Sequence, residues 1–335
     1  TDAGTVMVKD IRPGGTSSIP ISLTVVGNTL YFSANDGNTG RELWKSDGTN
    51  AGTMRVKDIN IGSSTSSSLS ADVEFTAIGN TLYFAADDGV NGHELWKSDG
   101  TVNGTVMVKD IVAGNGSSYP EELTAVGSTL YFSAKDSVGR ELWKSDGTPS
   151  GTEMVKNIWT GSPGPGDSNP KEMVSIGNIL YFQAESYDVD GDNVSDGKEL
   201  WKSDGTSSGT VMVKNINPGT NSYGDSNPSE LTAVGNTLYF SANDGSSGSE
   251  LWKSDGTDAG TVMVKDINSG NISSSPVLLT AVGNTLYFKA LYGSLGEEIW
   301  KSDGTSSGTV MVDEVRPGGL SANINHLTAV GNTLY

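Results

Sequence analysis

The sequence contains no cysteine and only two histidines in 335 residues. Without cysteine the chain can form neither disulfides nor thiolate metal sites, and it has no thiol nucleophile. The two histidines, His93 and His326, are too few for a histidine metal site, and no nucleophile motif accompanies them. These absences favour a chain that is not an enzyme.

Long apolar runs and an excess of basic residues are also missing. No apolar run approaches the roughly 20 residues that a membrane-spanning helix needs. With 40 acidic against 21 basic residues the net charge is −19, which repels phosphate backbones and anionic lipid surfaces. We therefore expect neither nucleic acid as a partner nor membrane insertion. The acidic excess suits a salty or calcium-containing medium, or it is simply a solubilising surface.

Glycine is abundant, with 44 residues, whereas long runs of helix-forming residues are lacking. That balance favours short strands joined by turns. The motif Gly-Asn-Thr-Leu-Tyr-Phe, with small changes, recurs from Gly27 to Gly331, which is 331 − 27 = 304 residues over six intervals. A repeat of about 51 residues is typical of propellers and arrays.

Two further motifs repeat in step with the first. Glu-Leu-Trp-Lys-Ser-Asp-Gly-Thr, with Ile for Leu in the last copy, begins at Glu42, Glu94, Glu141, Glu199, Glu250 and Glu298. Gly-Thr-Val-Met-Val-Lys-Asp-Ile or a close variant begins at Gly4, Gly52, Gly104, Gly151, Gly209, Gly260 and Gly308. One unit predicts four short strands, at Leu231–Val234, Thr237–Asn243, Glu250–Ser254 and Thr261–Ile267.

The joins within a unit are hairpin-sized, so each unit is expected to be a four-stranded antiparallel meander. Apolar neighbours such as Leu238, Tyr239 and Phe240 require cover on both faces of the sheet, which radially packed blades provide. The sequence therefore predicts an all-β fold, a single β-propeller domain over residues 1–335. We expect blades at residues 23–59, 75–111, 123–158, 173–216, 231–267 and 279–315.

A seventh, closing blade is expected from the two ends of the sequence, with residues 327–335 as its inner strands and residues 1–11 as its outer strand. Its third strand has no counterpart in the sequence. We expect the natural chain to continue past Tyr335 with another Glu-Leu-Trp segment, or a partner chain to supply that strand. The alternative is a six-bladed ring with flanking fragments of a longer array.

The Glu-Leu-Trp-Lys-Ser-Asp-Gly-Thr string, followed by Gly-Thr-Val-Met-Val-Lys-Asp-Ile, resembles the ELWxxDGT repeat family of bacterial secreted and surface proteins. The resemblance covers essentially the whole chain. It implies an extracellular β-propeller module, often part of a larger surface protein. It implies no common activity.

Residues that recur in every unit are expected to build the scaffold. The motif tryptophans suit packing between blades, and a ring of sugar-stacking tryptophans is the alternative. They are Trp44, Trp96, Trp143, Trp201, Trp252 and Trp300. The aspartates before the motif glycine are expected to accept backbone hydrogen bonds in a turn, with metal binding as the alternative. They are Asp47, Asp99, Asp146, Asp204, Asp255 and Asp303.

An unrepeated acidic insertion in the fourth unit resembles a calcium-binding loop. Its candidate ligands, spaced like positions 1, 3, 5, 9 and 12 of such a loop, are Asp188, Asp190, Asp192, Asp196 and Glu199. The turn glycine departs from the pattern, because Asn193 holds its usual place. We expect Ca²⁺ here, and a merely acidic solvated loop is the alternative.

Other unrepeated residues lie in the connections between units, where binding residues often occur. Trp159, Tyr223, Asp225 and Tyr119 are candidate ligand-binding residues, with ordinary loop anchoring as the alternative. The resulting hypothesis is a non-enzymatic, calcium-associated extracellular module for adhesion that binds a glycan or protein. One alternative is a self-associating building block of a surface filament or layer. The other is an enzyme with a central-channel active site.

Overall fold

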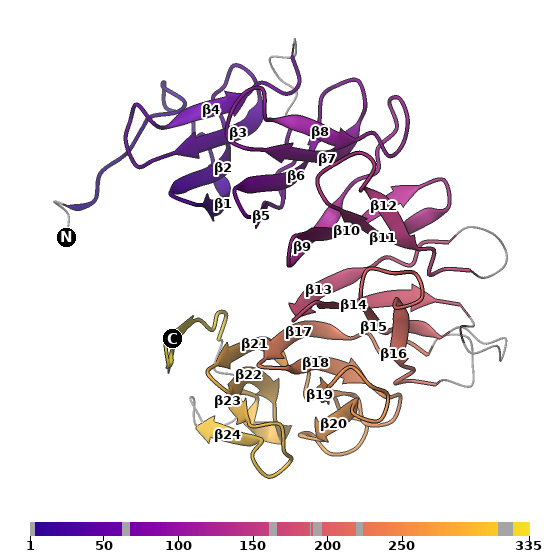
Figure 1. Cartoon of the computed structure of the whole chain (residues 1–335). Coiled ribbons are helices and arrows are strands. Elements are labelled where there is room, and N and C mark those ends of the chain that lie inside the picture. The colour runs from indigo at the N-terminus through magenta and orange to yellow at the C-terminus, as the bar shows by residue number, and fades with distance from the viewer. Residues whose placement is uncertain are drawn as a thin grey trace. The chain divides into compact units, whose positions relative to one another are not determined.

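The computed structural model of the chain describes residues 4–61, 68–160, 166–187, 189, 196–218, 224–313 and 324–335. The chain divides into two compact units, Thr1–Met154 and Val155–Tyr335. The described residues form six four-stranded antiparallel sheets, whose strands β1 to β24 are labelled in Figure 1, and one two-stranded sheet. No helix in this part of the chain has the length and apolar character needed to cross a bilayer.

The first unit holds three sheets, each with its strands in sequence order. The first contains β1 (Ile21–Val26), β2 (Thr29–Asn35), β3 (Arg41–Ser46) and β4 (Met54–Lys57). The second contains β5 (Thr76–Ile78), β6 (Thr81–Asp87), β7 (His93–Ser98) and β8 (Val106–Lys109). The third contains β9 (Glu121–Val126), β10 (Thr129–Asp136), β11 (Gly139–Ser145) and β12 (Glu153–Lys156), and β12 crosses the boundary between the units.

The second unit holds the other three four-stranded sheets and a C-terminal hairpin. The fourth sheet contains β13 (Lys171–Ile176), β14 (Ile179–Ser186), β15 (Gly197–Ser203) and β16 (Val211–Lys214). The fifth contains β17 (Ser229–Val234), β18 (Thr237–Asn243), β19 (Ser249–Ser254) and β20 (Val262–Lys265). The sixth contains β21 (Val277–Val282), β22 (Thr285–Leu291), β23 (Glu297–Ser302) and β24 (Val310–Asp313), with the 3-10 turn η2 (Gly293–Leu295) before β23. The hairpin pairs β25 (Ala329–Val330) with β26 (Thr333–Leu334).

Consecutive sheets within a unit pack face to face through apolar side chains of the repeat. In the first unit, Val56 and Ile59 of the first repeat share a core with Phe84 and Trp96 of the second. In the second unit, Val264 and Ile267 of the fifth repeat likewise share a core with Phe288 and Trp300 of the sixth. All six motif tryptophans are at most 7 % exposed, which confirms their role in packing.

The all-β prediction and the four-stranded antiparallel units are confirmed, and the six sheets are consistent with a propeller-like arrangement. The expected closing blade is not among the described sheets. Thr5 to Ile11 contain no strand, and β25 and β26 pair only with each other. Even so, Lys9 Nζ donates to the carbonyl of Thr53 at 2.7 Å, as lysines at the end of fourth strands do.

Candidate functional site

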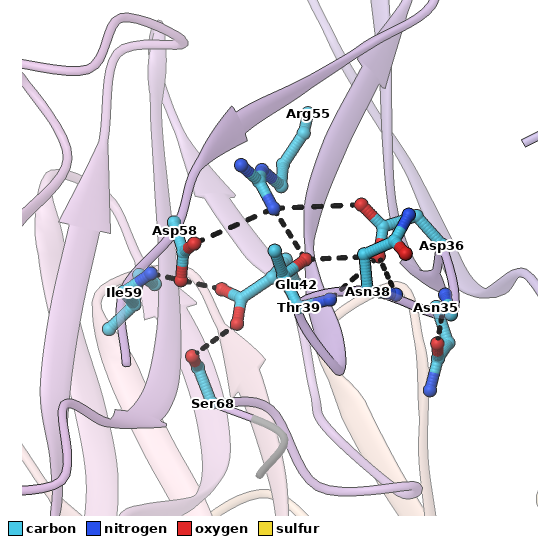
Figure 2. A network of polar contacts seen from close by, with 10 residues as sticks. Asn35, Asp36, Asn38, Thr39, Glu42, Arg55, Asp58, Ile59 and Ser68 are labelled. Carbon is cyan, nitrogen blue, oxygen red and sulfur yellow. Dashed lines mark hydrogen bonds and ion pairs between the residues drawn. The ribbon is translucent and has the colours of Figure 1, made fainter. Parts of the chain in front are cut away.

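A buried glutamate holds the connection between consecutive repeats. Glu42 is fully buried, and its carboxylate accepts hydrogen bonds from the Ser68 hydroxyl at 2.6 Å and from the Ile59 amide at 3.1 Å. Figure 2 shows this network together with Arg55, which forms ion pairs with Asp36 and Asp58. Burial raises the pKa of Glu42 to about 7, although the bonds from Ser68 and Ile59 oppose the shift.

The same contact recurs along the chain. The serine hydroxyl lies 2.6 Å from the glutamate in the pairs Glu94–Ser118, Glu199–Ser226 and Glu250–Ser274. A carboxylate that is buried in this way serves the scaffold. An aspartate also stands a few residues before five of the motif glutamates, as Asp36 does before Glu42. It has a separate role, because Asp36 accepts the amides of its own turn, at Asn38 and Thr39. The pairing of these aspartates with the motif glutamates therefore builds turns and connections.

This contact decides which unrepeated residues meet. The residue before the glutamate lies beside the residue after the serine, so His93 meets Tyr119. The Tyr119 amide donates to the His93 carbonyl at 3.2 Å, and the two rings stack with centroids 5.5 Å apart and planes 24° from parallel. Tyr119 is half exposed and lies in the left-handed region, with φ of 46° just before Pro120. The residues before the equivalent prolines, Ile19, Asn169, Asn227 and Ser275, have the same positive φ, so this backbone conformation belongs to the repeat.

A pocket of about 470 Å³ opens next to this aromatic pair, within the first unit. It arises because the second repeat departs from the others. Pro120 lies seven residues before Gly127, whereas the equivalent Ser70 lies nine residues before Gly79. The two extra residues shorten β5 to three residues and leave room beside it. The pocket is lined by Ser70, Asp72, Val73, Glu74, Ala85, His93, Tyr119, Pro120, Glu121, Glu122 and Leu123, and we call it the acidic pocket.

Four carboxylates line the acidic pocket, and several are held in place. Glu74 accepts the Leu123 amide at 3.0 Å. Arg140 donates to the Tyr119 carbonyl at 2.9 Å and lies 3.5 Å from Glu121. With one nearby guanidinium against four carboxylates, the pocket favours a cation. The face of a tyrosine ring adds to that attraction.

The pocket lacks the contacts of a hydrolytic centre. The His93 imidazole lies 3.9 Å from Asp87 and stacks on Tyr119, and within the described residues it has no hydrogen bond from a serine hydroxyl. Nor do the residues described here bring together three or more side chains that could hold a metal ion. The arrangement can bind and orient a ligand.

The structure describes only two of the five predicted calcium ligands, Asp196 and Glu199. Asp188, Asp190 and Asp192 lie outside the described residues. Asp196 is buried and accepts the Val189 amide at 2.7 Å, and the Glu199 carboxylate makes the scaffold contact described above. Calcium binding at this loop stays a prediction.

The other predicted ligand residues have separate surroundings. In the second unit, Trp159 packs against Tyr187 with ring centroids 6.1 Å apart. Asp225, also there, accepts the Lys198 amide at 2.9 Å and anchors a connection. Tyr223 lies outside the described residues. Of the four, only Tyr119 lines the acidic pocket.

Sequence reasoning missed His93, Glu74 and the other acidic lining residues. The signal was present in the sequence. Ser70 stands where five other repeats have proline, and two extra residues follow it. A repeat that lacks the proline and has two extra residues in its first connection cannot pack as the other repeats do, so a pocket is to be expected beside it.

The chain matches neither a family model nor a curated protein. Its fold does match solved structures. Prolyl oligopeptidase B from Galerina marginata, as the apo protein, has a TM-score of 0.53 at 13 % identity over 95 % of this chain and 46 % of that chain. A mutant of the same enzyme, bound to a 35mer hydrolysis and macrocyclization substrate, has a TM-score of 0.50 at 14 % identity over 90 % and 43 %. The chain therefore spans less than half the length of these structures, and the part matched is their propeller domain.

This finding overturns the hypothesis of a non-enzymatic module for adhesion or for building a surface layer. The two matched structures named above are of a prolyl oligopeptidase. The hypothesis rested on the lack of a nucleophile motif and of a histidine site. Such a lack concerns catalytic residues within the repeats, and it says nothing against a propeller that takes part in peptide hydrolysis.

Proposed function

We propose that this chain is the propeller part of a peptide hydrolase and that its acidic pocket binds the cationic end of a peptide. The acidic pocket, with its stacked Tyr119 and His93, is the observation that carries this proposal. The peptide hydrolase activity of the whole protein is likewise proposed.

The chemistry of the pocket suits a peptide that carries a free ammonium or guanidinium group. Glu74, Glu121 and Glu122 offer carboxylate oxygens to an N–H donor, and such charge-assisted hydrogen bonds are the stronger ones. A cation over the face of Tyr119 adds about 0.5–2 kcal/mol. The cavity of about 470 Å³ is large enough for one or two residues of a peptide.

The similarity in fold to solved structures also supports a role in binding peptides. One of the matched structures is bound to a 35mer substrate, so this type of propeller occurs in proteins that handle long peptides. In the proposed role the propeller holds the cationic end while the remainder of the peptide reaches the catalytic centre. Proteins of the same fold can differ in function, so the pocket itself must be tested.

We further propose that the repeats are the blades of a seven-bladed propeller, that the hairpin β25–β26 begins its seventh blade and that residues 4–11 form the outer strand of a blade. Two contacts support this. The strand β25 contacts β21, as one innermost strand contacts the next. Lys9 makes the hydrogen bond to Thr53 that Lys57 makes to Thr105 one repeat later.

Calorimetric titration with short peptides tests the pocket. We expect the amidated peptide Arg-Ala-Pro-Ala to bind, and its acetylated counterpart with Glu in place of Arg to bind at least tenfold more weakly. The substitution Tyr119→Ala should weaken the first peptide about tenfold, which corresponds to about 1.4 kcal/mol. Ile19→Ala, at the equivalent position of the first repeat, is the matched control and should leave the affinity unchanged.

Equal affinity for the two peptides would refute the proposed charge selection. Equal losses from Tyr119→Ala and Ile19→Ala would place the binding elsewhere on the protein.

A further inference from the structure

The first and third repeats each place an arginine side chain at the same point of the repeat. Arg41 stands directly before the motif glutamate, and its guanidinium donates to the Ser33 hydroxyl at 3.1 Å and to the Ile19 carbonyl at 3.0 Å. In the third repeat the equivalent Arg140 donates to the Tyr119 carbonyl at 2.9 Å and also to the serine of its second strand. Both guanidinium groups therefore lie between the second strand and the residue before the proline.

The second repeat, which lies between these two, lacks both the arginine and the serine. Alanine replaces the serine and histidine replaces the arginine, as Ala85 and His93. The His93 imidazole stacks on the Tyr119 ring. Ala85 and His93 line the acidic pocket, and so does Ser70, which stands in place of the proline. The acidic pocket therefore lies where the neighbouring repeats hold a guanidinium.

Other repeats also supply a cation at one of these two positions. The fourth repeat has Lys198 in place of the arginine, and the sixth has Lys289 in place of the serine. Lys289 Nζ lies 3.1 Å from the Glu297 carboxylate. The second repeat has neither lysine nor arginine at the two positions, although four carboxylates line its pocket. Because a nearby positive charge stabilises ionised carboxylates, this pocket suits a cation that a ligand brings.

Building on the function proposed above, we propose that the acidic pocket binds an arginine side chain of the peptide, in the place that Arg41 and Arg140 occupy in the neighbouring repeats. The carboxylates of the pocket accept its N–H groups, and the Tyr119 ring lies against it. A guanidinium is planar, holds several donors in a fixed fork and is more weakly hydrated than an ammonium group, so a lined pocket with several carboxylates favours arginine over lysine. The terminal ammonium of the peptide is not required.

Calorimetric titration with three peptides tests this preference. All three are acetylated and amidated, so that only the first side chain carries charge, and they are Arg-Ala-Pro-Ala, Lys-Ala-Pro-Ala and citrulline-Ala-Pro-Ala. We expect the arginine peptide to bind the wild-type chain about tenfold more tightly than the lysine peptide. The citrulline peptide, whose neutral urea replaces the guanidinium, should bind more weakly than the arginine peptide by about tenfold or more.

A variant that supplies the missing arginine tests the place of binding. Ala85→Ser with His93→Arg gives the second repeat the pair found in the first and third. The new guanidinium should fill the acidic pocket, so that the affinity for the acetylated arginine peptide falls about tenfold.

Two controls accompany this variant. Ala85→Ser with His93→Gln removes the imidazole without adding a guanidinium and should weaken binding much less. Ser249→Arg places an arginine at the equivalent position of the fifth repeat, beside Ser241, and should leave the affinity unchanged. Circular dichroism establishes that each variant folds, and the three peptides on the wild-type chain decide the matter if the arginine variant does not fold.

The outcomes separate this inference from the proposed function. Equal affinity for the arginine and lysine peptides overturns the inference and leaves the proposed function standing. So does binding of unacetylated but not of acetylated Arg-Ala-Pro-Ala, since the pocket then holds the terminal ammonium. Failure of every cationic peptide to bind overturns both. Undiminished affinity in the arginine variant, or an equal loss in the glutamine variant, means that the ligand does not take the place of the missing arginine.

Discussion

The glutamate that opens each Glu-Leu-Trp motif is a buried carboxylate rather than a surface one. The sequence places it beside a turn aspartate and so suggests a pair of solvated acids. It does not show that the serine of a distant connection closes over the glutamate, because that contact joins residues 24 to 27 positions apart. The turn aspartates were predictable, because their partners are local. Asp47, for example, accepts the Thr49 amide at 2.9 Å.

These buried carboxylates make stability depend on pH in a defined direction. Burial raises the pKa of Glu42 to about 7 and that of Glu199 to about 8, above the ordinary value of 4.5. Their contribution to the free energy of unfolding is full below about pH 4.5 and is lost as the pH rises through 7 to 8. The exposed turn aspartates act in the opposite sense. The Thr49 hydroxyl and amide lower the pKa of Asp47, so its contribution is lost in acid.

We therefore expect the urea midpoint of the chain to fall as the pH is raised from 5.5 to 8.5, measured by tryptophan fluorescence. Glu199→Gln should remove part of this fall, because the amide stays neutral at all these pH values. Glu153→Gln, which changes a carboxylate that is 58 % exposed, is the control and should leave the slope unchanged. A flat profile in the wild type would contradict the buried ionisable role of these glutamates.

At the scale of single strands, the sequence predicts well which strands each repeat contains, but it predicts poorly where a strand is shorter than its equivalents. The fourth strand of the fifth repeat was expected at Thr261–Ile267, but β20 covers only Val262–Lys265. It ends early because the Ile267 amide donates to the Glu250 carboxylate at 2.9 Å instead of to a neighbouring strand. The first strand of the second repeat is likewise short, and it is this exception that opens the acidic pocket.

Restoring the common first strand should close that pocket. Deleting Ala71 and Asp72 together with Ser70→Pro gives the second repeat the length and proline of the third. We expect affinity for the cationic peptide to fall at least tenfold, while thermal stability stays equal or rises, since proline at a compatible site adds about 0.4–1 kcal/mol. Calorimetry and thermal unfolding measure the two effects. The same Ser70→Pro substitution without the deletion is the control for the proline alone.

For the molecule as a whole, the sequence predicts the kind of sheet because each repeat carries its own strand and turn signals, whereas the number of blades stays a prediction. It does not predict the division at Met154 and Val155, since the same motifs recur on both sides of that boundary. Calcium binding and an extracellular location likewise stay predictions, because the first depends on residues outside the described part and the second on a resemblance.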